Sequence, residues 1–369
     1  MMRTTIGSAQ SVRHGCRLLL LTALCLLTLS CRRENGGAEY RLAYSVFFPA
    51  SHVQSQLACE WAEEVYQRTG GRVRIDVFPG GTLSGAAENF DCVINRVSDV
   101  GMSCFSYTRG LFPLMEALDL PLGYPDGMAA TRIANDFLAR FQPEELSDVH
   151  VLYVHAHGPG LLATIQPVAS LDDLKGRSIR GTGITAQMVK AIGANAVGMS
   201  QPDTYEALRR GVVDGTFCPM ETLKGWRQGE VINHVTKVPA AGYTTAMFAV
   251  MNKQVWERFP DDIKATISEV SREWVERHGK AWDEIDREGL EFVKGLGKTI
   301  TEMKPEEDAL VAAALLPMLE SWVKKSDAAG LPGTEAMAFL KAAVAEARQN
   351  QAAAAATQTT GEAKQGEQP

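Results

Sequence analysis

The 369-residue chain lacks the short motifs with which many enzymes hold a nucleotide, a metal ion or a nucleophile. It contains no GxSxG, no HExxH, no GxxxxGK and no GxGxxG after a predicted strand, and "GTG" at 181–183 has none of the remaining positions of the last pattern. Cys–His or Ser–His pairs could still assemble in three dimensions, but the sequence singles out none. We therefore predict that the protein is not an enzyme and uses no cofactor.

The chain also has no excess of positive charge. It carries 37 Lys and Arg against 44 Asp and Glu, for a net charge of -7. Removing the N-terminal segment with its three arginines lowers the net charge to about -10. An acidic protein of this kind is a poor partner for nucleic acid or for an anionic membrane surface.

No apolar run is long enough to cross a membrane, because the run from Leu18 to Leu29 falls short of the ~20 residues that a spanning helix needs. Arginines precede this run and no acidic residue does, which is typical of a secretory signal peptide over residues 1–30. Its end, "LTLSC", resembles a bacterial lipoprotein cleavage site, so we predict lipidation of Cys31 and membrane contact only through that anchor. Ordinary cleavage and release is the alternative.

Cysteine is scarce in the remaining chain and shows no CxxC spacing. Cys59, Cys92, Cys104 and Cys218 are scattered, and spacing alone establishes no disulfide. We expect these side chains to be buried as small hydrophobic groups.

What the chain does contain is an alternation of strand and helix patterns over about 310 residues, enough for two α/β lobes built on mainly parallel sheets. Two apolar strands, 151–158 and 244–252, end successive blocks, and an amphipathic helix follows at about 254–294. We therefore predict a two-lobed clamshell with crossing hinge strands and a long spine helix. Lobe I comprises 39–153 and about 244–285, lobe II comprises 154–243 and about 286–349, and 350–369 forms a disordered tail.

Residues 171–215 carry a resemblance to a known family. In "LDDLKGRSIRGTGITAQMVKAIGANAVGMSQPDTYEALRRGVVDG", the Asp-Leu-Lys-Gly turn, the strand ending in Arg, "GAN", "YEAL" and "GVVDG" follow in the order and spacing of the solute-binding subunits of tripartite ATP-independent periplasmic (TRAP) transporters. Weaker agreement runs through "FPGGTLSG" and "FPLMEALDLPLGYP", so the similarity covers roughly 45 to 345. The resemblance implies a periplasmic clamshell that closes on an organic acid and delivers it to a membrane permease.

Arg180 ends a predicted strand, where α/β sheets place their clefts. A guanidinium is permanently charged and can hold a carboxylate through two hydrogen bonds, and Gly181 would leave room for that approach. A salt bridge to Asp172 or Asp173 is the structural alternative. Arg180 also matches the ligand-anchoring arginine of the family, which favours carboxylate binding.

One arginine is too weak to hold a ligand alone, so apolar walls must contribute. Phe48, Tyr107 and Tyr243 stand in loops or at strand ends that should face the cleft, although packing in the core is an alternative for each. His155 and His157 share one face of a strand, but two imidazoles without a third ligand do not make a convincing metal site. We predict that His157 donates a hydrogen bond to the ligand and that no metal is bound.

Two positions depart from the commonest family pattern. Gly160 and Cys218 stand where many relatives carry polar side chains, which favours a monocarboxylate with an apolar or aromatic body over a dicarboxylate or a sialic acid. Met220 is a candidate pocket wall, and Glu221 is a candidate acceptor for an amine or hydroxyl. The alternative for Glu221 is a first-turn helix acid that interacts with the helix dipole.

The sequence thus predicts an extracytoplasmic solute-binding protein with a carboxylate ligand and TRAP permease subunits as partners. A ligand-sensing lipoprotein that serves a receptor kinase is the first alternative, and a metal-dependent hydrolase is the second.

Overall fold

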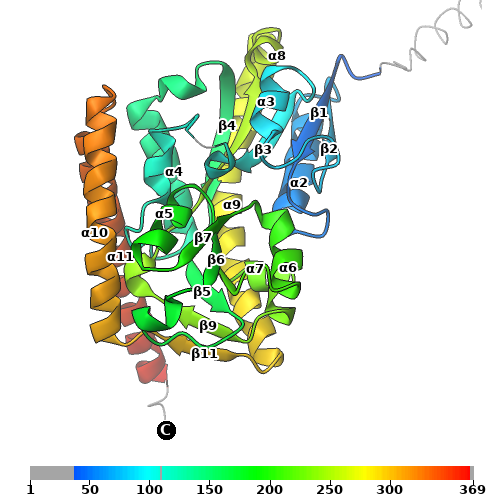
Figure 1. The fold of residues 1–369 in the computed structure, drawn as a ribbon. Helices are drawn as coiled ribbons and strands as arrows, with labels where there is room; N and C mark the ends of the chain where they lie inside the picture. Colours follow the sequence, from blue (N-terminus) through cyan, green and yellow to red (C-terminus); the bar gives the residue numbers. More distant parts are fainter. Residues whose placement is uncertain (1–36, 109, 366–369) are drawn as a thin grey trace, which may run out of the picture. The chain divides into compact units, whose positions relative to one another are not determined.

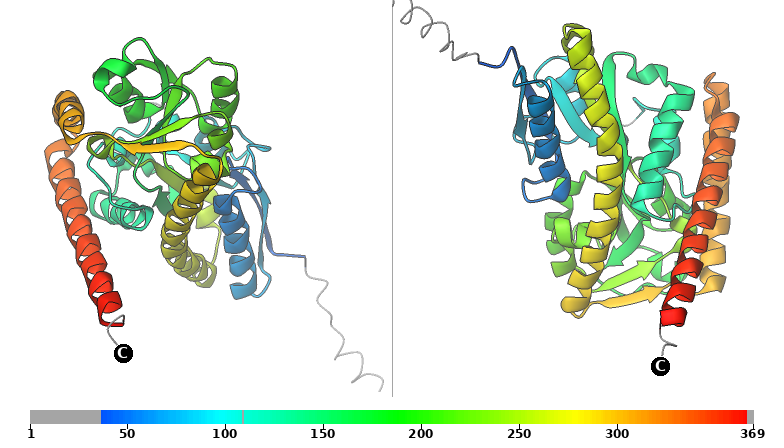
Figure 2. Two further views of the ribbon diagram at one scale, coloured as in Figure 1. Left: turned by 90° about the horizontal axis from the view of Figure 1, so that it is seen from below. Right: turned by 180° about the vertical axis from the view of Figure 1, so that it is seen from behind.

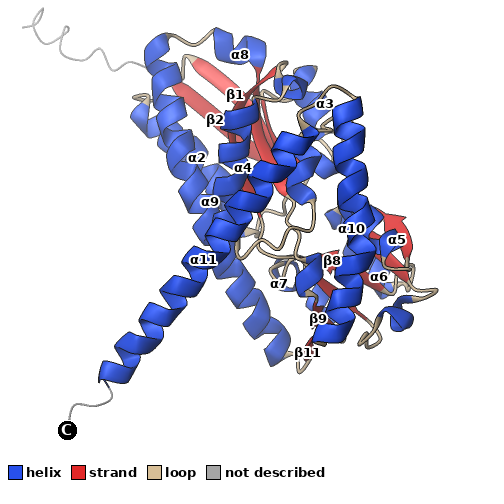
Figure 3. Ribbon diagram, turned by 90° about the vertical axis from the view of Figure 1, so that its left-hand side faces the viewer, coloured by secondary structure: helices blue, strands red, loops and turns tan. Residues whose placement is uncertain are grey.

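The computed structural model describes residues 37–108 and 110–365, so the predicted signal peptide and Cys31 lie outside the described residues. From Tyr40 onward the chain forms one compact unit. This unit holds two β-sheets with helices packed around them, and the strands of the two sheets occupy separate regions of the unit (Figure 1, Figure 3). The α/β two-lobed architecture predicted from the sequence is therefore confirmed.

The sheet of lobe I has five strands in the order β2-β1-β3-β10-β4. Strand β1 runs parallel to β2 and β3, whereas β10 runs antiparallel to both β3 and β4. The strands span Tyr40–Val46 (β1), Val73–Phe78 (β2), Val100–Cys104 (β3), Val149–Ala156 (β4) and Ala246–Asn252 (β10).

The sheet of lobe II has six strands in the order β11-β9-β5-β8-β6-β7. Only β5 runs antiparallel to its neighbours, β8 and β9. The strands span Leu161–Thr164 (β5), Ser178–Gly181 (β6), Asn195–Gly198 (β7), Gly215–Cys218 (β8), His234–Lys237 (β9) and Thr299–Glu302 (β11).

Both sheets are mainly parallel, as predicted, and each contains one antiparallel strand because the chain crosses between the lobes and returns. It passes from β4 into β5 and comes back from β9 into β10, and β5 and β10 therefore enter their sheets in the opposite direction. The two crossing segments are bonded to each other, since Gly160 N donates to Tyr243 O at 2.8 Å. This pair of segments forms the predicted hinge, while the predicted residue boundaries of the lobes stay a prediction.

A long helix, α9 (Asp261–Gly295), is the third connection between the lobes. Its 35 residues reach about 52 Å at ~1.5 Å per residue. Figure 2 shows it running past both sheets, and it packs on helices α2 (Val53–Arg68) and α4 (Gly127–Phe141) of lobe I and on α7 (Thr222–Gly225) of lobe II. Its buried stripe includes Ile263, Ile267, Val270 and Trp274.

The predicted spine helix of 254–294 is divided in the structure. A short helix, α8 (Lys253–Glu257), comes first, and α9 begins only after Pro260. Proline lacks the backbone N–H of a helix interior and disfavours helical geometry in the residue before it, so the chain breaks there.

The remaining helices cover the sheets: α3 (Asn89–Ile94), α5 (Gly183–Ala191), α6 (Gln201–Arg209), α10 (Pro305–Ala328) and α11 (Gly333–Gln365). Helix α11 packs on α10 and α4 and continues through residues that we had assigned to a disordered tail from position 350. An alanine run at 352–356 explains this correction, since alanine has the highest helix propensity. Within 37–108 and 110–365, no helix combines the length and apolar character that a membrane span requires.

Candidate ligand-binding site

A small cavity of about 40 Å³ lies where the two lobes and the hinge meet. Six of the eight residues predicted to bind ligand line it, namely Phe48, Tyr107, His157, Arg180, Glu221 and Tyr243. Its other lining residues are Phe47, Cys104, Thr182, Gln201, Pro219, Thr222, Trp226, Thr245, Met247 and Trp282. Long-range folding thus brings together residues from position 47 to position 282.

Arg180 stands near the carboxyl end of β6, as predicted, and is 95% buried with a relative exposure of 5%. Its Nε donates to Met199 O at 3.1 Å and its Nη1 donates to Phe217 O at 3.3 Å. The alternative salt bridge is not formed, because Asp172 pairs with Lys175 and Asp173 accepts from Ala169 N and Ser170 N. No described carboxylate pairs with Arg180, so its charge faces a cavity without a counterion from the described chain.

Two further donors share the cavity with Arg180. Gln201 has a relative exposure of 7%, and its Nε2 makes no hydrogen bond within the described structure. Tyr243 is buried, and its hydroxyl likewise bonds to none of the described residues; burial raises its pKa well above the usual value. A buried donor without a partner loses the hydrogen bonds that it had in water, so a ligand that accepts from it gains affinity.

Tyr107 connects the two lobes across the same cavity. Gln201 N, in the first turn of α6, donates to Tyr107 Oη at 3.1 Å. Because this hydroxyl already accepts a bond, its own proton is available to the ligand or to the neighbouring Cys104. Tyr107 is therefore placed as the sequence predicted, but it also bridges the lobes.

Glu221 reaches across the cavity to the other lobe. Its Oε2 lies 2.9 Å from Nε2 of His52, the N-cap residue of α2, and its Oε1 accepts from the Thr222 hydroxyl at 2.8 Å. Glu221 stands at the N-cap of α7 but makes no side-chain cap bond there. This position agrees with the helix-dipole alternative, while the bonds to His52 and Thr222 hold the side chain at the cavity.

The hydrogen bonds of His52 assign its tautomer. Its Nδ1 accepts from Gln54 N at 3.2 Å, so Nδ1 carries no proton and Nε2 is the donor to Glu221. His52 is thus a neutral donor, and both oxygens of Glu221 act as acceptors.

His157 lines the cavity, but the direction predicted for its hydrogen bond is reversed. Its Nδ1 lies 2.5 Å from Gly158 O, and a carbonyl can only accept, so the ring proton is on Nδ1. Burial lowers the pKa of His157 to about 4, which keeps the ring neutral near pH 7. Nε2, which bonds to no described residue, is therefore an acceptor rather than the donor that we expected.

Aromatic rings form the walls of the cavity. Phe47 of lobe I stacks with Trp226 of lobe II at a centroid distance of 6.1 Å, and Phe48 lies 6.0 Å from both Trp226 and Trp282. Tyr243 meets the His157 ring edge-on at 5.5 Å. Such walls suit a flat apolar body.

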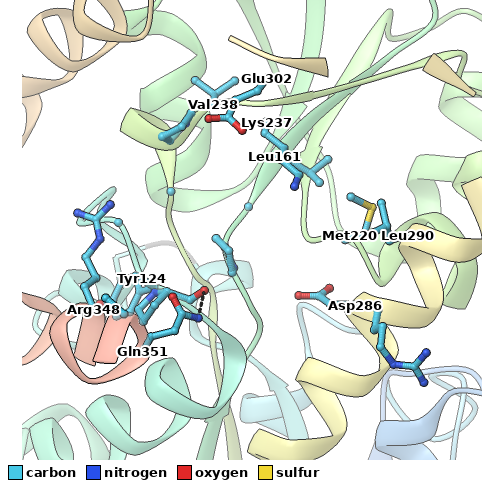
Figure 4. Close-up of a pocket in the computed structure, with 18 residues that line it drawn as sticks. Tyr124, Leu161, Met220, Lys237, Val238, Asp286, Leu290, Glu302, Arg348 and Gln351 are labelled. Atoms are coloured by element: carbon cyan, nitrogen blue, oxygen red, sulfur yellow. Dashed lines mark hydrogen bonds between the residues drawn. The ribbon is translucent and has the colours of Figure 1, made fainter. Parts of the chain in front are cut away.

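Gly181 and Met220 lie outside the cavity. A side chain at Gly181 would come within 2.9 Å of Ala186 N, so this glycine lets the backbone of α5 approach β6 rather than making room for a carboxylate. Met220 lines a separate groove of about 860 Å³ behind the hinge, beside Leu290 and Asp286 (Figure 4). Gly181 lines the groove that adjoins the cavity between the lobes, and a ligand contact of Gly181 or Met220 stays a prediction.

Gly160 has a structural reason to lack a side chain. A Cβ atom at this position would lie 2.0 Å from Cε1 of Tyr243. The ring of Tyr243 thus occupies the space that a polar side chain at position 160 would need.

The cavity opens toward a larger groove of about 790 Å³ between the lobes, with which it shares Phe47, Tyr107 and Thr182. This groove is lined by the loop at Gly80–Gly81 of lobe I and by the first turns of α5 and α6. We interpret it as the mouth through which a solute enters.

The remaining predictions concern cysteine and metal. The four cysteines of the described chain are free, and Cys104 and Cys218 are buried, but Cys59 is exposed on α2, where our expectation of burial was wrong. His155 accepts from Trp282 Nε1 at 3.1 Å and stacks on His278, and the described residues contain no group of three side chains suited to a metal ion.

Sequence reasoning missed His52, Gln201, Trp226 and Trp282. Gln201 comes three residues after the end of β7, so the strand-end rule applied to Arg180 could have identified it. Trp282 falls within the predicted spine helix of 254–294. His52 and Trp226 carried no signal, because their place in the cavity depends on closure of one lobe against the other.

Two lobes, three connections and a cavity at their junction define a periplasmic binding protein, a class that closes about a hinge. Residues 44–326 match the family model of bacterial extracellular solute-binding protein, family 7. The chain belongs to this family, and the predicted resemblance is confirmed.

Several proteins whose ligands are named are similar to this chain in sequence or in structure. The C4-dicarboxylate-binding periplasmic protein DctP of Rhodobacter capsulatus is 24% identical over 83% of this chain and 93% of its own. A marine metagenome TRAP solute-binding protein specific for aromatic acids, in complex with metahydroxyphenylacetate, is 27% identical with a TM-score of 0.79, over 83% of this chain and 99% of its own. A TRAP solute-binding protein of Bordetella bronchiseptica with bound mandelate is 27% identical with a TM-score of 0.77, over the same shares.

Proposed function

We propose that this protein captures an aromatic monocarboxylate by a contact between the ligand carboxylate and Arg180, closes its lobes around it and delivers it to a TRAP permease. The observation that carries the proposal is the buried guanidinium of Arg180, which faces an aromatic cavity and pairs with no described carboxylate. A buried charge without a counterion is unfavourable, so an anionic ligand is the natural complement.

The donors around Arg180 fit a carboxylate. Gln201 Nε2 lacks a partner in the described chain, and both Gln201 and Tyr243 line the same cavity. Each charge-assisted hydrogen bond contributes ~1.5–3 kcal/mol, so Arg180 and one further donor supply a substantial part of the ~8 kcal/mol that micromolar affinity requires. Burial of an apolar ring against the aromatic walls would supply the rest.

A dicarboxylate fits less well. Arg180 is the only Lys or Arg among the described residues that line the cavity. A second ligand carboxylate would therefore lack a cation and would meet Glu221. The aromatic-acid ligands of the two solved relatives agree with this preference, whereas the dicarboxylate ligand of the Rhodobacter relative does not.

Delivery and anchoring complete the proposal. The family places such proteins in the periplasm with a membrane permease as partner, and we propose lipidation of Cys31 as the means of attachment.

Calorimetry with purified protein tests the ligand class. Benzoate, phenylacetate and mandelate should bind, and succinate should bind at least ~10-fold more weakly, the worth of one charge-assisted hydrogen bond. Arg180→Ala should abolish carboxylate binding while the protein stays folded. The matched control is Arg177→Ala, three residues earlier, whose guanidinium donates to the carbonyls of Gln166 and Pro167 outside the cavity. Undiminished affinity in Arg180→Ala would refute the assignment.

A further inference from the structure

Hydrogen-bond acceptors line the cavity as well as donors. A carboxylate ligand explains Arg180, Gln201 and Tyr243, but it can only accept and therefore leaves Glu221 and His157 unexplained.

Glu221 is a buried acceptor with spare capacity. Each of its oxygens receives one hydrogen bond, from His52 Nε2 at 2.9 Å and from the Thr222 hydroxyl at 2.8 Å. A carboxylate has about four lone-pair sites, so two remain. Both known donors are neutral, and no described Lys or Arg pairs with Glu221.

His157 is a second acceptor in the same cavity. Its proton is committed to Gly158 O, which leaves Nε2 with a lone pair and no partner in the described chain. Two charged groups act on His157. The carboxylate of Glu221 raises its pKa and the guanidinium of Arg180 lowers it, while burial has the largest effect and lowers it. His157 therefore lies within electrostatic range of both the carboxylate anchor and Glu221.

We propose that the ligand is an aromatic acid that also bears a hydrogen-bond donor, a hydroxyl or an amine, which Glu221 and His157 receive. This inference rests on the proposed function, because it concerns the remainder of a ligand already held by Arg180. Glu221 and His157 select for the donor. An acid without one leaves His157 Nε2 without a donor and the remaining lone pairs of Glu221 unused, and sites built to bond a hydroxyl reject analogues that lack it.

Matched ligand pairs test the inference on the wild-type protein. Calorimetry compares meta- and para-hydroxybenzoate and the corresponding aminobenzoates with benzoate, and mandelate with phenylacetate. At least one donor-bearing acid should bind ~10-fold or more tightly than its partner, the effect of one hydrogen bond to a charged group. The hydroxyl and amine series show which donor the site accepts.

Methoxybenzoates separate hydrogen-bond donation from size. A methoxy group fills the same position but has no proton to donate, so these acids should lose the whole advantage of the hydroxybenzoates. If a methoxybenzoate binds as tightly as its hydroxy counterpart, or if no donor-bearing acid exceeds its partner, the inference is overturned. This comparison needs no variant and stands even if a substitution prevents folding.

Glu221→Gln then tests the residue. Gln keeps the size of the side chain but replaces one acceptor oxygen with a donor, so the affinity ratio of hydroxybenzoate to benzoate should fall toward one. The control is Glu288→Gln, which removes a carboxylate that bonds Lys224 on the surface and should keep the wild-type ratio. An unchanged ratio in Glu221→Gln would contradict the role of Glu221.

Failure of the inference can be told from failure of the proposed function. If benzoate, its hydroxylated forms and mandelate all fail to bind, the proposed aromatic-acid function is wrong. If benzoate binds and the donor adds nothing, only the inference falls.

Discussion

At the scale of single residues, the cavity is defined by polar atoms that the protein leaves unsatisfied. The guanidinium of Arg180 has no counterion, Gln201 Nε2 has no acceptor, and His157 Nε2 has no donor within the described chain. In a protein interior such groups normally find partners, so their gathering in one cavity indicates what the ligand must offer.

Gln201 provides a prediction at this scale. Gln201→Leu removes the unpaired donor with little change in volume and should weaken carboxylate binding by about 10-fold, the worth of one hydrogen bond. Gln201→Glu should weaken it further, because it sets a carboxylate against the ligand carboxylate. Titration calorimetry with benzoate measures both.

Gln187→Leu is the control for Gln201, since Gln187 is exposed on α5 and lies outside the cavity. Equal affinities for wild type and both Gln201 variants would show that the side chain does not face the ligand.

At the scale of elements, α9 links the back of the hinge to the cavity. It carries Trp282 into the cavity and Asp286 to the groove behind it (Figure 4). Gly289 allows this close approach, since a Cβ atom there would lie 2.3 Å from Met220 O. Asp286 Oδ1 accepts from Glu221 N at 2.7 Å, so α9 fixes the backbone of a residue that lines the cavity.

Asp286 makes a pH-dependent prediction. Burial, with a smaller contribution from the neighbouring Glu221, raises its pKa to about 8 from the ~3.9 of an exposed Asp. Between these values the unfolded state has released a proton that the folded state keeps. The free energy of unfolding therefore falls as pH rises from about 4 to 8.

Asp286→Asn removes this titration and keeps an acceptor for Glu221 N. As pH rises from 5 to 8, the wild type should lose a few kcal/mol in free energy of unfolding, at most ~1.4 kcal/mol per pH unit. The variant should not show this loss. Urea unfolding at both pH values measures the difference, and Glu288→Gln on the same helix is the control. A difference between Asp286→Asn and wild type that does not change with pH would refute the assignment.

At the scale of the whole molecule, the lobes meet through contacts that surround the ligand site. His52 bonds Glu221, Tyr107 bonds Gln201 N, and Phe47 stacks on Trp226, and in each pair one residue belongs to lobe I and the other to lobe II. Opening the clamshell would break all three, so the described structure has the contacts of a closed state.

Trp226 should report this closure. Ligand binding should change tryptophan fluorescence as Trp226 moves against Phe47 and Phe48, and Trp226→Phe should remove most of that change. Trp256→Phe is the control, because Trp256 stacks on His150 far from the cavity lining. An undiminished ligand-dependent signal in Trp226→Phe would contradict closure at this contact.

Much of the fold followed from local patterns. The apolar runs at 151–158 and 244–252 predicted β4 and β10, and the amphipathic pattern at about 254–294 predicted α9. The resemblance over 171–215 located Arg180 and the two-lobed class. The break at Pro260 and the helix beyond position 350 were missed, although proline and alanine signalled both.

The sequence by itself determined the class of fold and the family and singled out Arg180, because periodicity, charge and motif spacing are properties of neighbouring positions. Only the tertiary structure decided which partners those residues have. It packed Tyr243 against Gly160 and brought His52 within hydrogen-bond distance of Glu221. It also directed the Nδ1 proton of His157 toward Gly158 O. Whether a buried side chain donates or accepts depends on atoms that lie far away in the sequence, and for that reason the polarity of the ligand site emerged only when the lobes were brought together.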